Sequence, residues 1–297
     1  MSVDRRRLLS EAGLLAITAV WGWTFVVVHE AVALLAPLPF LASRFLIAAA
    51  LVAAVFWRQT LALGLGGLKA GLAMGAALTA GYVFQTSGLT LTSAANAGFI
   101  TGMVVVFTPF LGALFLRQKV TAQAWVLAGV AALGMYLLSG VEGKWNPGDL
   151  LVLGCALSFA AHILITDRVV QRHHPGALVV VQVAFCGLAC LGGSLALGQW
   201  RLPPTPQVWW AIGITAVLAS ALGFFVQTTA QRYTTPARTA LIITAEPVFA
   251  GLAAYFLAGE RFTARRLLGA ALILTAILWA ELSRLRAEQS EPDPAPP

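Results

Sequence analysis

Glu246 is the residue whose position points most directly to chemistry. It lies near the middle of an apolar run at 236–258, and Pro247 follows it. If that run crosses a bilayer, a charge at its centre costs at least ~2.5–3.5 kcal/mol. A carboxyl group placed there can hold a proton in one conformation and release it to water in another. The alternative is a protonated glutamate that only bonds to a neighbouring helix. Pro247 removes a helical hydrogen bond and predicts a helix break.

Arg44 is a second charge within an apolar run, here at 37–57. At 1.5 Å of rise per residue it lies roughly 10 Å from the start of that run at Pro37. Three roles remain open. Arg44 can pair with a carboxylate, for which Glu30 and Glu246 are the candidates, it can contact an anionic group of a substrate, or it can extend its charged end to the bilayer surface.

Other polar and aromatic side chains also interrupt the apolar runs. Trp21 and Trp23 are two residues apart and point to different sides of a helix, so at most one faces a cavity, and we favour Trp21. His162 is alone in its run, and core packing is favoured over a role as a proton relay. The uncharged groups that can either bond across helices or line a polar cavity are Tyr82, Gln85, Asn96 and Gln227.

The elements that must position these residues are predicted to be membrane helices. The chain is 59% apolar and 10% charged, with a mean hydropathy of +0.83, whereas soluble domains carry about 25% charged residues. Backbone groups have no water partner in hydrocarbon, so helices are the expected form. Ten apolar runs are long enough to span a bilayer, at 9–31, 37–57, 68–89, 93–116, 123–140, 148–169, 177–198, 207–230, 236–258 and 264–283.

The distribution of lysine and arginine predicts how these runs are oriented. With the N-terminus inside, the predicted cytoplasmic segments hold 13 of these residues and the opposite segments hold five. The positive-inside rule therefore places both termini in the cytoplasm of a multi-pass protein of the cell (inner or plasma) membrane. The net charge of +7 is scattered between apolar runs and forms no single basic surface, so we expect no nucleic-acid partner.

An internal repeat relates the two halves. Residues 81–121 align with 223–263 at a constant offset of 142, which pairs Gln85 with Gln227, and Pro37 aligns with Pro175, which pairs Arg44 with Gln182. A duplication of five spans leaves the second copy inverted in the membrane. The predicted fold is therefore an all-α integral membrane protein of ten transmembrane helices, arranged as two inverted five-helix repeats around a central cavity. Such repeats are typical of alternating-access transporters, with the substrate site at the repeat interface.

Three sets of residues resemble the EamA-type unit of the drug/metabolite transporter superfamily, and the resemblance covers nearly the whole chain. The residues are Trp21-Gly22-Trp23-Thr24-Phe25 with Pro37 and Arg44-Phe45-Leu46, then Ala245-Glu246-Pro247-Val248-Phe249, and finally Gly259-Glu260-Arg261-Phe262-Thr263 with 268–273. The resemblance implies a cavity lined by the first, third and fourth spans of each half. It also implies export or exchange of amino acids, nucleosides, sugars, nucleotide sugars or toxic compounds. The first half departs from the pattern, with Gln118-Lys119 opposite Glu260-Arg261.

These patterns divide the chain into a cytoplasmic N-terminus at 1–8, a first EamA-like repeat at 9–140, a second at 148–283 and a disordered cytoplasmic tail at 287–297. The expected function is secondary active transport of amino-acid-like, nucleoside-like or drug-like solutes, with protons as a candidate coupling ion. The alternative is a non-transporting membrane receptor or assembly protein.

The expected partners are a small-molecule substrate and the lipid bilayer. The motifs of intramembrane enzymes are missing from the sequence, so we expect no enzyme, no cofactor and no metal site. Small residues such as Gly98 and Gly102 are interpreted as packing within the bundle, which favours a monomer over an obligate dimer.

Overall fold

The computed structural model describes residues 3–92, 94–117, 119–139, 146–258 and 263–290. Within these residues all regular secondary structure is helical. The first half contains α1 (Val3–Val32), α2 (Pro37–Leu61), α3 (Gly64–Gly88), α4 (Ala94–Gly102), α5 (Val104–Leu116) and α6 (Ala122–Ser139). The second half contains α7 (Pro147–Val170), α8 (Pro175–Ala196), α9 (Pro206–Ile214), the π-helix η1 (Thr215–Leu222), α10 (Gly223–Ala230), α11 (Pro236–Ile243), α12 (Glu246–Ala258) and α13 (Ala264–Ser290).

Seven helical stretches of the described residues are long and apolar enough to cross a membrane. They are Arg5–Val32, Pro37–Leu61, Gly64–Gly88, Ala97–Leu116, Pro147–Val170, Pro175–Ala196 and Pro206–Ala230. Proline is the first residue of many of the helices. It is tolerated there because an N–H group in the first turn makes no hydrogen bond within the helix. Side chains of Asn146, Thr205 and Thr235 cap α7, α9 and α11. The apolar pattern and the start signals therefore agree with the helices observed.

The terminal helices extend further than the apolar runs predict. Helix α1 begins at Val3 and includes most of the segment assigned to a cytoplasmic N-terminus, and α13 continues to Ser290, past the predicted start of the disordered tail at 287. The charged residues on these ends favour water without opposing a helix, and the first proline of the tail comes only at Pro292. The rest of the predicted tail, 291–297, lies outside the described residues.

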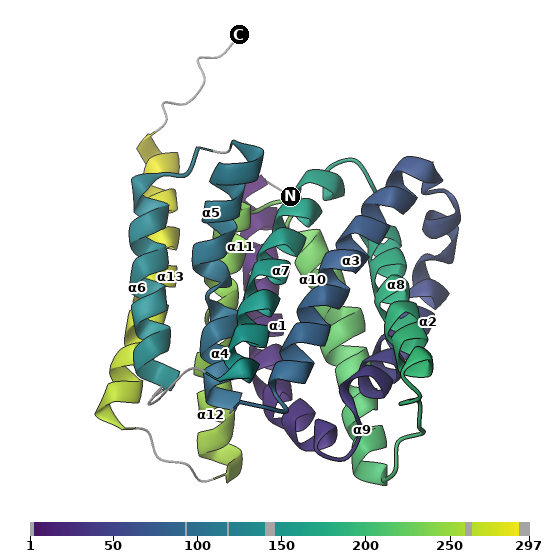
Figure 1. Cartoon of the computed structure of the whole chain (residues 1–297). Helices are drawn as coiled ribbons and strands as arrows, with labels where there is room; N and C mark the ends of the chain where they lie inside the picture. Colours follow the sequence, from purple (N-terminus) through teal and green to yellow (C-terminus); the bar gives the residue numbers. More distant parts are fainter. Residues whose placement is uncertain (1–2, 93, 118, 140–145, 259–262, 291–297) are drawn as a thin grey trace.

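The helices run side by side along one direction (Figure 1). Helix α1 begins and α13 ends at the same end of the bundle, which we call the terminal end; the other is the opposite end. Helices α6 and α13 pack together at one edge, and α2 and α8 pack together at the other edge. Between these edges, α1 contacts α10 and α12, while α7 contacts α3 and α5. The centre of the bundle is thus built from helices of both halves.

Two of the predicted apolar runs are interrupted, and the break in one of them lies where Pro247 predicts it. The run at 93–116 is divided at Met103 into α4 and α5, and the run at 236–258 is divided at Thr244 and Ala245 into α11 and α12. Pro247 lies just after the second break and cannot donate a hydrogen bond to the carbonyl of Ile243. At the first break, the Met103 N–H donates to the Ile100 carbonyl oxygen at 3.1 Å, which closes the tighter turn of a 3₁₀-helix.

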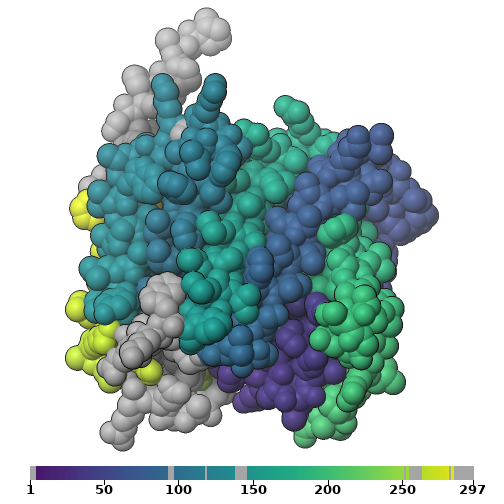
Figure 2. Space-filling model, viewed as in Figure 1, coloured from purple at the N-terminus to yellow at the C-terminus, as the bar shows by residue number. Residues whose placement is uncertain are grey.

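Large apolar side chains remain exposed on the sides of the bundle, as expected for a surface in contact with lipid. Phe115 is 71% exposed, Val55 67% and Val126 62%. Figure 2 shows one such side, where α3, α5, α6 and α7 form a closely packed surface. In water such a surface would drive aggregation, so its chemistry matches the membrane setting that the hydropathy predicts.

Gly22 sets the distance between α1 and α12. A β-carbon at this position would collide with the Glu246 carbonyl oxygen and would lie 2.8 Å from the Ala250 backbone nitrogen. Backbone atoms cannot move aside as a flexible side chain can. The approach of α1 to the helix that carries Glu246 therefore requires glycine at this position.

We expect Gly22→Ala to destabilise the protein by ~1–3 kcal/mol, because the added methyl group forces α1 away from α12. The apparent melting temperature of the detergent-solubilised protein measures the effect, and we expect it to fall by several degrees. Gly129→Ala is the matched control, since a β-carbon at Gly129 meets nothing within 4 Å. Equal melting temperatures for the two variants would contradict the close contact described here.

Candidate functional site

A central cavity lies between the two halves. The volume open to the centre of a water molecule is about 70 Å³, which is room for only a few waters. The first half contributes side chains from α1, α2, α3, α4 and α5, and the second half contributes them from α7, α10, α11 and α12. Four kinds of side chain line it: two charged ones, Arg44 and Glu246; aromatic ones, including Trp21, Tyr82, Phe159 and Phe224; polar ones, including Thr24, Gln85, Thr101, His162 and Gln227; and aliphatic ones, Val28, Leu89, Val104, Ile163 and Ile243.

Arg44 is 3% exposed and is held by polar and aromatic neighbours. Its Nε donates to Ser220 Oγ at 2.7 Å, and its Nη2 donates to Tyr82 Oη at 3.4 Å. The guanidinium carbon lies 4.8 Å from the centre of the Tyr82 ring and 5.2 Å from that of Phe45. Among the described residues no carboxylate forms an ion pair with Arg44, so the pairing with Glu30 or Glu246 that we considered is not formed in this conformation. The Nη1 group also has no partner there, and it remains available to a ligand.

Glu246 enters the cavity from the first turn of α12, just after the helix break. Within the described part of the chain, no side chain or backbone group donates a hydrogen bond to its carboxyl group. A carboxyl group in a largely apolar setting is costly unless it is protonated or satisfied by a ligand or water. Among the polar groups of the cavity, the carboxyl group of Glu246 is therefore the one with the fewest hydrogen-bonding or ionic partners in the described part of the protein.

Trp21 lines the cavity, whereas Trp23 makes an edge-to-face contact with Trp210 of α9. The indole Nε1 of Trp21 donates to the Ala219 carbonyl oxygen at 2.8 Å. Ala219 and Ser220 belong to η1, so this π-helix is tied to α1 through Trp21 and to α2 through Arg44. π-helices are rare and are found mostly at functional sites, since they rotate side chains out of the regular α register.

Aromatic rings surround Arg44 and the middle of the cavity. Tyr82 meets Phe45 at 4.9 Å, Phe159 at 5.2 Å and Phe224 at 6.0 Å between ring centres, each edge to face. Phe224 also lies 5.8 Å from Trp21. Such a group of rings offers flat faces and a slightly negative surface, which suits an apolar body or a cation.

The remaining candidates make hydrogen bonds within the protein. His162 Nε2 lies 2.6 Å from Gln182 Oε1, and Gln182 Nε2 donates to Thr228 Oγ1 at 3.4 Å. Gln85 Nε2 donates to Thr101 Oγ1 at 3.3 Å. Gln227 Nε2 and Gln231 Oε1 are 3.5 Å apart, the longest of these contacts. Except for the Gln227–Gln231 contact, which lies within α10 and its C-cap, these bonds couple different helices, and Gln85, Gln227 and His162 all line the cavity.

The structure thus brings seven of the predicted residues to one cavity: Glu246, Arg44, Trp21, Tyr82, Gln85, Gln227 and His162. The eighth, Asn96, is in α4, but its side chain lies outside the described part of the chain. Sequence reasoning missed Phe159 and Phe224. Phe224 is the repeat partner of Tyr82 at the offset of 142, and Phe159 is the partner of Trp21 at the offset of 138 that relates Pro37 to Pro175. Extending the repeat alignment to 14–33 and 152–171 would have found Phe159.

The arrangement is suited to binding rather than to bond-making. In the described residues, no three His, Cys, Asp or Glu side chains gather as they would around a metal ion. The cavity instead offers one cation, one acid and several rings at fixed places. These groups can orient a small solute that carries charges of both signs.

Comparisons with known proteins give a consistent result. A family model described as the EamA-like transporter family matches residues 9–140 and again 146–281. An "uncharacterized transporter" of Archaeoglobus fulgidus is 32% identical over 277 residues, which is 93% of this chain and 87% of the relative. An "S-adenosylmethionine uptake transporter" of Rickettsia prowazekii is 24% identical over 214 residues, 71% of each chain. A solved crystal structure has the same fold, with a TM-score of 0.77, 17% identity, and 97% of this chain and 100% of that chain covered.

We expect Trp21→Phe to lower the stability of the protein by ~1 kcal/mol, because an aromatic ring remains, although a smaller one, while the Ala219 carbonyl loses its donor. Thermal unfolding followed by circular dichroism measures the change. Trp23→Phe is the control, since no hydrogen bond from the Trp23 indole is present among the described residues. A larger loss for Trp23→Phe than for Trp21→Phe would show that the bond to η1 contributes little.

Proposed function

This chain belongs to the EamA-like transporter family, and we propose that it is a secondary active transporter that exports or exchanges small metabolites by alternating access. The observation that carries the proposal is the central cavity, in which Arg44 and Glu246 face the same space between the two halves. A site at the interface of two repeats is the usual substrate site of such transporters.

We further propose that the chain crosses the membrane ten times as two inverted repeats. In this arrangement α4 with α5, α9 with η1 and α10, and α11 with α12 each form one crossing, and α6 and α13 provide the fifth and tenth. The double match of the family model supports two repeats. So does the packing, in which the contact of α1 with α12 has its counterpart in the contact of α7 with α5. The positive-inside rule assigns the terminal end to the cytoplasm.

The proposed substrate is amino-acid-like, meaning a solute that carries a carboxylate and a cationic group. Arg44 has a free Nη1 for the carboxylate, and Glu246 has no described partner and can bind the cation. Two relatives named as S-adenosylmethionine uptake transporters support this choice, because S-adenosylmethionine has a carboxylate, an ammonium and a sulfonium group. A nucleoside or an apolar drug would leave both charges of the cavity unmatched, which is costly.

Proton coupling through Glu246 is part of the proposal. When no substrate is bound, protonation removes the cost of a buried charge, and when a cationic substrate binds, the ionised carboxylate is stabilised by it. Substrate and proton then compete for one group. Competition of this kind produces exchange of substrate for protons. The larger of the two gradients, that of the substrate or that of the protons, then sets the direction of net transport.

We expect purified protein in proteoliposomes to exchange S-adenosylmethionine or another zwitterionic amino acid saturably, and not to exchange adenosine or glucose. The measurement is counterflow of the labelled solute into preloaded vesicles. Arg44→Lys keeps the charge but loses the planar fork and the ring contacts, so the apparent affinity for the zwitterion should fall at least tenfold. Flux of nucleosides without amino acids would contradict the substrate class. Absence of saturable flux for a broad panel would favour a receptor or assembly protein over a transporter.

We expect Glu246→Gln to remove the dependence of transport on a pH gradient, because an amide cannot exchange a proton in this range. Initial rates with and without an imposed gradient test this expectation. Glu30→Gln is the control, since Glu30 is exposed and lies outside the cavity. If the rate and the pH dependence of Glu246→Gln equal those of the parent protein, proton coupling through this carboxyl group is wrong.

A further inference from the structure

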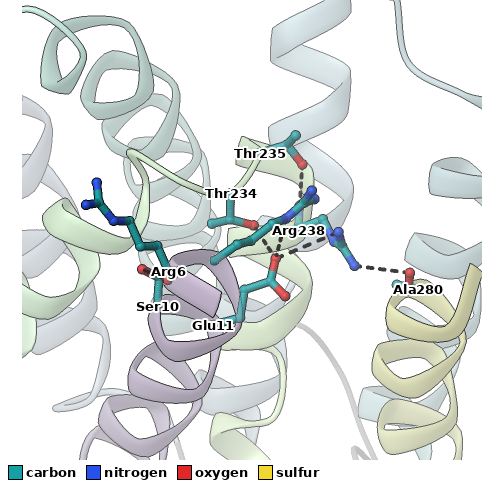
Figure 3. Close-up of polar contacts among 8 residues, drawn as sticks. Arg6, Ser10, Glu11, Thr234, Thr235, Arg238 and Ala280 are labelled. Carbon is teal, nitrogen blue, oxygen red and sulfur yellow. Dashed lines mark hydrogen bonds and ion pairs between the residues drawn. The ribbon is translucent and has the colours of Figure 1, made fainter. Parts of the chain in front are cut away.

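At the terminal end, the first helix is tied to the second half by a buried carboxylate. Glu11 of α1 is 7% exposed, and its Oε1 accepts a hydrogen bond from Thr234 Oγ1 at 2.8 Å. Arg238 of α11 lies 3.8 Å from the same oxygen, and its Nη2 also donates to the Ala280 carbonyl oxygen of α13 at 3.1 Å. Figure 3 shows Glu11 of α1 beside Thr234 and Arg238, with Arg238 reaching on to Ala280 of α13.

At the opposite end, a second buried carboxylate ties the second half to the first. Asp149 of α7 is 4% exposed, and its Oδ1 accepts a hydrogen bond from Thr92 Oγ1 at 2.6 Å. Asn146 Nδ2 also donates to Thr92 Oγ1, at 3.4 Å. The other oxygen of Asp149 accepts from the backbone N–H of Asn146, so the acid is part of the cap of α7.

The two contacts occupy equivalent places in the internal repeat. Thr92 and Thr234 are partners at the offset of 142, and both end the segment that follows the third span of their half. Glu11 and Asp149 are partners at the offset of 138, the same offset that relates Arg44 to Gln182. In each contact the acid comes from one half and the threonine from the other. Either bond breaks if the helix that carries the acid moves away from the threonine of the other half at that end.

We propose that Glu11 with Thr234 and Asp149 with Thr92 are paired latches, each of which opens in one of the two access states. This inference rests on the proposed alternating access and names the contacts that control it. Both latches are closed in this structure, which fits a cavity with room for only a few waters. Release of one latch widens the path to Arg44 and Glu246 from that end.

A bond from a hydroxyl to a carboxylate is well suited to this task. It is stronger than a bond between neutral groups, yet water can replace it when the end of the bundle opens. At the terminal end the longer contact of Glu11 with Arg238 accompanies it. The acids also keep neighbours from their own half after release: Arg7 for Glu11 and the Asn146 backbone for Asp149. Each acid therefore stays satisfied in the open state, and the contact can form again.

The test measures from which side the cavity can be reached, and it needs no substrate. Cys155, Cys186 and Cys190 are replaced by alanine, and Val104→Cys serves as the reporter on the cavity wall. A membrane-impermeant thiol reagent is applied to vesicles of both orientations. Thr234→Val should raise the rate of labelling from the terminal end about three- to tenfold. Thr92→Val should raise it by a similar factor from the opposite end, and the double variant should raise both.

Control variants at the same sites and at neighbouring threonines separate the loss of the hydrogen bond from other effects of substitution. Thr234→Ser and Thr92→Ser retain the hydroxyl and should label as the parent does. Thr235→Val and Thr90→Val alter neighbouring threonines whose hydroxyls bond only within their own half, and they should not shift the side of access. The proposal is wrong if both valine variants raise the rate of labelling from the same side. It is also wrong if neither variant labels differently from the parent protein. Transport activity with unshifted labelling would reject the latches alone, whereas shifted labelling without transport would reject the proposed function alone.

Discussion

The absence of water from the hydrocarbon layer is the constraint on which the rest of this structure depends. Each polar group within it must be satisfied by the protein, and most are. Threonines such as Thr18, Thr166 and Thr215 donate to carbonyls of their own helices, and Arg44 donates across to Ser220 and Tyr82. The two charged groups with spare capacity, Arg44 and Glu246, face the central cavity, whereas the buried hydroxyls that lack a partner among the described residues, those of Thr108, Ser194, Thr229 and Thr239, lie outside it. The lack of water in hydrocarbon thus favours helices, and it also makes Arg44 and Glu246 the groups to which a solute in the cavity can bind.

Apart from a kink at Phe56 in α2, the breaks within the described spans border this cavity. The break at Met103 lies between Thr101 and Val104, and the break at Thr244 and Ala245 lies between Ile243 and Glu246; all four flanking residues line the cavity. The π-helix η1 provides Ala219 and Ser220 as partners of Trp21 and Arg44. Non-helical backbone at membrane depth is tolerated where protein or a cavity surrounds it rather than lipid. The departures from regular helix are therefore concentrated where the two halves meet.

Much of this could be predicted from the sequence, because the strongest signals are the simplest. The apolar runs indicate the helices, and rare charges such as Glu246 and Arg44 indicate the cavity, since hydrocarbon excludes them elsewhere. The partners of those charges were harder to predict. Arg44 bonds to Ser220, a small residue with no signal of its own, because packing of α2 against η1 decides which hydroxyl is in reach. The break at Met103 has no proline beside it, and the aromatic wall at Phe159 looks like ordinary core.

Apart from the identical pair Gln85 and Gln227, the repeat partners that line the cavity differ from each other, although the helices around it repeat. Tyr82 has Phe224 as its counterpart, Trp21 has Phe159, and Glu246 has the apolar Val104. A cavity with true two-fold symmetry would receive a solute equally well in either of two opposed poses. In this cavity the acid, Glu246, lies on one wall only, so the two ends of a bound solute meet different chemical groups. In the transport that we propose, a bound molecule therefore keeps one orientation while it crosses the membrane.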